Sequence, residues 1–129
     1  MKVLAEISVG ELFDKITILN IKTKKIEDKQ KLKNILKELN TLNEQATKID
    51  ISDKLSLDDQ VKKLQSINEE LWDIENFKRE CEANKDFGEN FIKLSRDVHF
   101  KNDIRAKIKK EINLLSNSII VEEKEYSKY

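Results

Sequence analysis

One stretch of the chain, "HFKNDIRAKI" from His99 to Ile108, places polar side chains where helical spacing would place apolar ones. Apolar residues recur at intervals of three and four on both sides of it, which is typical of one face of a helix. They are Phe91, Leu94, Val98, Ile108, Ile112 and Leu115. The middle of this stripe instead holds Lys101, Asn102 and Arg105. Asn102 and Arg105 lie within about 60° of each other around the helix, so an amide and a guanidinium share the apolar face.

A guanidinium on an apolar face requires a negative partner, because a buried charge without one is costly. The first interpretation is an ion pair with a carboxylate on a facing helix. The candidates are Asp14, Asp73 and Glu80. The second is a pocket for an anionic ligand, completed by Lys15 or Lys101. The ion pair is favoured, since buried charges are usually paired within the protein.

Other reactive side chains do not form a recognisable catalytic or metal-binding set. His99 is the sole histidine, and no serine or cysteine partner is indicated for it. Cys81, the sole cysteine, falls on an apolar stripe and cannot form an internal disulfide. The sequence indicates no catalytic residue, no metal site and no cofactor, and it favours a protein that is not an enzyme.

The composition limits the class of protein. The chain has 129 residues, of which 38% are hydrophobic and 39% charged, with two glycines and no proline. These proportions favour amphipathic helices within a single domain spanning residues 1–129. Lys+Arg and Asp+Glu both number 25, and the missing basic excess argues against nucleic-acid binding. No apolar run is long enough for a signal peptide or a membrane span, so we expect a cytoplasmic protein.

The first helix is predicted to begin after Ser8, which with Glu11 forms a capping-box pattern. Its apolar residues fall on two faces, with Ile18 and Ile21 on the second. Such a helix is either central in a bundle or part of a subunit interface. Asp28 is the expected break before the next helix, and one continuous helix from Val9 to about Lys48 is the alternative.

The second and third helices carry heptad stripes. In the second they are Leu32, Leu39 and Ala46 with Ile35, Leu42 and Ile49; in the third, Leu57, Leu64 and Leu71 with Ile67, Ile74 and Cys81. A short polar connector joins them, so we predict that they form a long antiparallel hairpin. Ser56 and Asp59 are predicted to cap the third helix, which ends near Asn84. Asp86 is predicted to cap a fourth, which runs to about Leu115. "KVLAEI" and "SIIVEE" at the two ends could pair as a short β ribbon or remain extended.

Five phrases of the sequence carry a resemblance: "EISVGELFDKITILNIK", "LWDIE", "DFGENFIKLSRDV", "NDIRAKIKKEIN" and "VEEKEY". Together they resemble a family of short uncharacterised proteins, a domain of unknown function of bacteria and phages. The likeness covers nearly the whole chain and is weakest from about Glu44 to Leu64. The family has no assigned activity, so the resemblance implies no catalytic residue. Members often have proline where this chain has Lys29, which leaves the break at Asp28 open.

The resemblance implies that eight residues belong to recurring motifs. These are the candidate ligand-binding residues: Asp14, Lys15, Trp72, Asp73, Arg96, Asn102, Asp103 and Arg105. We predict an all-α bundle that forms a homodimer and serves as a non-catalytic interaction or assembly module, with room for a further protein partner. The alternative is a small binder or enzyme for an anionic metabolite, of the sugar-phosphate or nucleotide-phosphate type, in the bundle core near Arg105.

Overall fold

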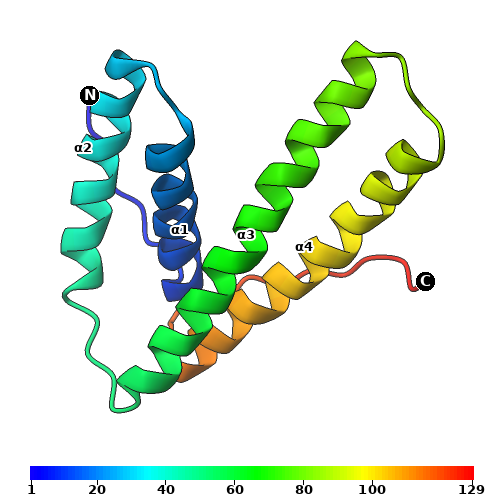
Figure 1. Ribbon diagram of the computed structural model, residues 1–129. Coiled ribbons are helices and arrows are strands. Elements are labelled where there is room, and N and C mark those ends of the chain that lie inside the picture. The colour runs from blue at the N-terminus through cyan, green and yellow to red at the C-terminus, as the bar shows by residue number, and fades with distance from the viewer.

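The computed structural model describes residues 1–129 and contains four helices. They are α1 (Val9–Lys25), α2 (Lys29–Ala46), α3 (Lys54–Ala83) and α4 (Glu89–Leu115). Figure 1 shows two antiparallel hairpins, α1–α2 and α3–α4, which meet at one end and diverge at the other. The predicted all-α bundle with a long antiparallel hairpin is confirmed. The terminal segments contain no strand, so the β ribbon does not form.

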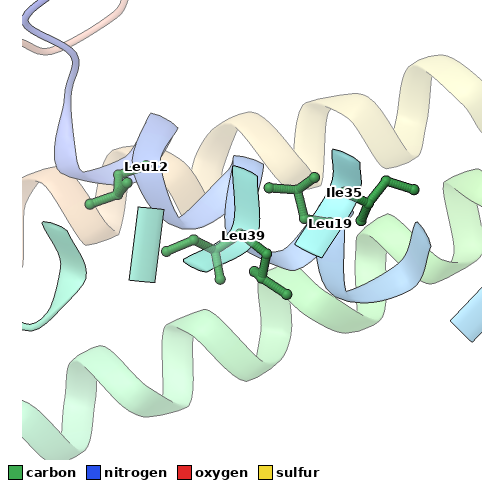
Figure 2. Close-up of a cluster of buried hydrophobic side chains, with 5 residues drawn as sticks. Leu12, Leu19, Ile35 and Leu39 are labelled. Carbon is green, nitrogen blue, oxygen red and sulfur yellow. The ribbon is translucent and has the colours of Figure 1, made fainter. Parts of the chain in front are cut away.

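The partners of the helices differ from the predicted ones. The second and third helices were expected to pair, but α2 contacts only α1, and α3 packs against α4 and α1. The apolar stripe of α2 meets that of α1, where Leu12, Leu19, Ile35 and Leu39 form one cluster (Figure 2). A heptad stripe shows that a helix has an apolar face but does not specify which other face it meets. The prediction of an α2–α3 hairpin is therefore wrong.

The central position of α1 explains its two apolar faces. One face contacts α2 and the other contacts α3 and α4. Ile21 on the second face is only 2% exposed, and Ile18 is half-buried. The second face is thus largely covered within the chain, and Ile21 is not available to a subunit interface.

Three of the helix ends illustrate how local residues set them. Asp28 caps α2 by accepting a hydrogen bond of 2.8 Å from the Lys31 amide, so the predicted break is confirmed and the continuous helix is wrong. The cap of α3 is Asp53 rather than Ser56, whose amide donates to the Asp53 carboxylate. The cap of α4 is Gly88 rather than Asp86.

No helix is both long and apolar enough to cross a bilayer.

The α3–α4 hairpin continues well beyond the point where α1 leaves it (Figure 1). We call residues 71–98 the distal hairpin. Its buried residues are Ile74, Cys81 and Leu94, which pack between its two helices. Leu71, on the predicted heptad stripe of the third helix, is only half-buried because it lines an open space between α1, α3 and α4. This part of the molecule is a two-helix layer with thin apolar packing.

Candidate functional site

The polar interruption of α4 is matched by a carboxylate on α1. Asp14 is 2% exposed and accepts two hydrogen bonds from Arg105, one from Nε at 2.9 Å and one from Nη2. The predicted internal ion pair is therefore present, and Asp14 is its carboxylate. Arg105 keeps about a quarter of its side chain exposed, whereas Asp14 is enclosed.

Further polar groups surround this ion pair. Asn68 of α3 donates to Asp14 Oδ1 and to Thr17 Oγ1, both at 2.9 Å. Lys109 lies 2.6 Å from a Glu11 oxygen and 3.7 Å from Asp14 Oδ2. The network connects α1, α3 and α4, and each buried polar atom in it has a partner, as buried polar groups require.

The ion pair keeps Asp14 ionised. Burial alone would raise the pKa of this carboxyl, because it disfavours the charged form. Hydrogen bonds from Arg105 and Asn68, with the positive charges of Arg105 and Lys109, outweigh burial and hold the pKa below its ordinary value of 3.8. The Asp14 hydrogen bond raises the pKa of Arg105. Neither group is therefore placed to exchange a proton near neutral pH.

A second polar network lies at the start of α1. The buried Asn113 of α4 accepts from the Gly10 amide at 2.7 Å and donates to Glu122 at 3.1 Å. Ser8 caps α1 and also donates to Glu122. The Val9 amide donates to Ser118 Oγ at 3.1 Å. The first turn of α1 is thus capped by residues more than 100 positions away, and the C-terminal segment is attached to it.

A cavity of about 280 Å³ lies where α1 separates from α3 and α4. Its lining includes Trp72, Asn102, Arg105, Ile18 and Leu71. The Asn102 side chain forms no hydrogen bond within the protein, although Arg105 beside it is paired. The cavity offers an indole ring, an amide and the outer edge of a guanidinium, and the Glu75 carboxylate, which is paired with Arg79, lies at its lining as well.

The other four candidates lie elsewhere. Lys15 is exposed and 3.8 Å from Glu11, and Asp73 is exposed on α3. Arg96 is exposed on α4 with its guanidinium 6.0 Å from the Phe100 ring centre. Asp103 accepts a hydrogen bond from the Tyr129 hydroxyl. Of the eight candidates, the structure brings together Asp14, Trp72, Asn102 and Arg105.

Sequence reasoning missed several residues of these networks. Asn68 and Asn113 are buried amides within apolar helix faces, the same signal that identified Arg105. Applying it to the whole chain would have found both. Gly10 gives no such signal, and its role appears only in the packing. A Cβ there would lie 2.6 Å from the Lys109 carbonyl oxygen, so glycine allows α1 to approach α4 closely.

Fold and site together define a small all-helical protein in which a buried ion-pair network joins α1, α3 and α4, and no group of three or more His, Cys, Asp or Glu side chains is placed to hold a metal ion. The profile of a family of unknown function, DUF6165, matches residues 1–129, and the chain belongs to that family. No curated protein and no solved structure matches the chain.

Proposed function

We propose that the protein is a non-catalytic assembly module that forms a homodimer through the distal hairpin. The supporting observation is that α3 and α4 extend as a two-helix layer past α1 and α2 (Figure 1). Helical domains bury apolar stripes by packing helices on more than one side. A second copy related by a two-fold axis would complete a four-helix bundle.

The face of the distal hairpin that continues the path of α1 has residues suited to an interface. Trp72, Leu71 and Val98 are half-buried and border the 280 Å³ cavity together with Ile18. Tryptophan and arginine are frequent among residues that dominate interface energies. Glu75 and Arg79 provide both signs of charge on α3, with Arg79 Nη2 3.1 Å from Glu75 Oε1. A two-fold axis would let each sign face its opposite in the second copy.

The dimer is tested by light scattering and by the emission of Trp72, the sole tryptophan. We expect a dimer at micromolar concentration and a red shift of the emission on dilution, as Trp72 becomes exposed to water. Ile18→Glu, which places a charge in the cavity, is expected to give a monomer. A monomeric wild type with emission independent of concentration contradicts the proposal.

Phe77→Glu provides the matched control. Phe77 is an exposed apolar residue of the same helix and lies about 140° around it from Trp72. The substitution adds the same charge on another face, so the dimer is expected to persist. Dissociation by both variants to the same extent would assign the association to general hydrophobic contact rather than to the Trp72 face.

The second candidate function is binding or turnover of an anionic metabolite, such as a sugar phosphate or nucleotide phosphate, in the same cavity. Its support is that Trp72, Asn102 and Arg105 line one space. Assembly is favoured because the Asp14 carboxylate already neutralises Arg105. A rise in the melting temperature with a sugar phosphate, abolished in Asn102→Ala, would favour the second candidate instead. The cytoplasmic location stays a prediction.

A further inference from the structure

A second cavity, of about 250 Å³, lies between α4 and the C-terminal segment. The residues after Asn117 turn back along α4 and are attached through Glu122 and Glu123 to Asn113 and Lys110. The cavity has five basic lining residues: Arg105, Lys107, Lys109, Lys110 and Lys124. Glu122 and Glu123 are its acidic lining residues. In a chain of zero net charge, this is a local concentration of positive charge in a concave surface.

The basic side chains of this cavity differ in how well they are paired. Arg105 and Lys109 are committed to Asp14 and Glu11. Lys110, about half exposed, contacts only the Glu123 carboxylate at 3.1 Å. Lys107 and Lys124 are exposed and have no carboxylate within ion-pair distance. Lys124 lies 5.9 Å from the Tyr126 ring centre, so neither lysine has a carboxylate that a ligand must displace, and Lys110 is held by one exposed carboxylate at the surface.

The size of the cavity restricts the ligand. Ala106 lies among the basic residues of α4, and its short side chain leaves the space open. A volume of 250 Å³ is just below the usual range for small-molecule pockets, about 300–1,000 Å³. It suits a phosphate group with a small organic substituent. A nucleic acid would need an extended basic stripe instead.

We propose that this cavity binds a small phosphate-bearing anion through Lys107, Lys110 and Lys124, while Arg105 and Lys109, neutralised by Asp14 and Glu11, form its inner wall. Lysine ammonium groups bind phosphate as point charges. A phosphate with two negative charges competes with the single charge of Glu123 for Lys110. The site shares Arg105 with the Trp72 cavity, but its lysines line only this one, and it does not depend on the dimer.

The test uses inorganic pyrophosphate as the probe and isothermal titration calorimetry as the measurement. Lys107→Gln combined with Lys124→Gln removes the two free cations, and both are exposed, so folding is expected to be unaffected. Affinity should fall by about tenfold or more, because two charge contacts are lost. The control replaces Lys33 and Lys37 by Gln, two exposed lysines of α2, and should bind as the wild type does.

A third variant distinguishes binding inside the cavity from a general attraction of the anion to the positive surface. Ala106→Leu fills the space and leaves every charge in place, so it should also weaken pyrophosphate binding. Unchanged affinity in Ala106→Leu overturns the proposal, as does equal weakening in the two lysine pairs. No binding of millimolar pyrophosphate to the wild type overturns it as well.

Discussion

At the level of single residues, the Asp14 carboxylate determines how three helices meet. Arg105 reaches it from α4 and Asn68 reaches it from α3. A two-pronged hydrogen bond fixes orientation as well as distance. We infer that the ion pair sets the rotation of α4 about its own axis relative to α1, which apolar packing alone specifies less strictly.

Removal of Arg105 should destabilise the protein, because it leaves Asp14 buried without its main partner. We expect Arg105→Ala to lower the free energy of unfolding by about 3 kcal/mol in a urea titration, the lower end for a broken buried pair. The value is low because Asn68 and Lys109 still contact Asp14. Arg105→Lys should recover only part of the loss, since an ammonium cannot form both bonds.

Arg96→Ala is the control for that measurement. Arg96 is an exposed arginine of the same helix without a carboxylate partner, so its removal should change stability by less than about 0.5 kcal/mol. An equal decrease in the free energy of unfolding for the two variants would mean that the Asp14–Arg105 pair contributes no more to stability than an exposed arginine does.

The pH dependence of stability should reflect the lowered pKa of Asp14. The folded state binds the Asp14 proton less readily than the unfolded state does, so acid favours unfolding. This contribution is complete well above pH 3.8 and is lost as the pH falls through 3.8 toward the folded pKa. Asp14→Asn should be less stable at neutral pH and should lose less of its stability in acid. An identical acid-induced loss in both proteins would contradict the assignment.

At the level of the helices, their existence and most of their ends could be predicted, because both depend on residues close in sequence. Asp28 and Ser8 cap their helices by accepting hydrogen bonds from backbone amides three residues further along the chain. The partners of the helices could not be predicted in the same way. The stripe of α2 matches that of α3 in period, and only the two-faced α1 could have indicated that it lies between other helices.

The crossing of α1 and α4 gives a prediction of its own. Gly10→Ala would gain about 1 kcal/mol of helix propensity in an isolated helix. In the protein the new Cβ would meet the Lys109 backbone at 2.6 Å, and backbone atoms cannot move aside alone. We therefore expect Gly10→Ala to lower the melting temperature by several degrees. Gly88→Ala is the control, because its Cβ would meet only the Asp86 side chain, at 3.3 Å.

At the level of the whole molecule, only part of the site was accessible from the sequence. Arg105 could be singled out because a charge on an apolar face needs a partner. The choice of Asp14 over Asp73 depends on which face of α1 meets α4, which is a property of the assembled bundle. Likewise, Trp72 and Asn102 border one cavity because α1 diverges from α3 and α4 at that point. The residues near Trp72 or Asn102 in sequence do not reveal the direction in which α1 leaves α3 and α4.

The C-terminal segment is predicted to stabilise the start of α1, more than 100 residues away in sequence. A chain ending at Asn117 loses the Ser118 hydroxyl that caps the Val9 amide and the Glu122 carboxylate bound to Ser8. We expect a loss of about 1–2 kcal/mol in the free energy of unfolding, since water can solvate part of what is uncovered. A chain ending at Glu123 keeps these contacts and should match the full chain within about 0.5 kcal/mol. Urea titrations at one protein concentration compare the three chains, and equal stability of all three would show that α1 needs no cap from this segment.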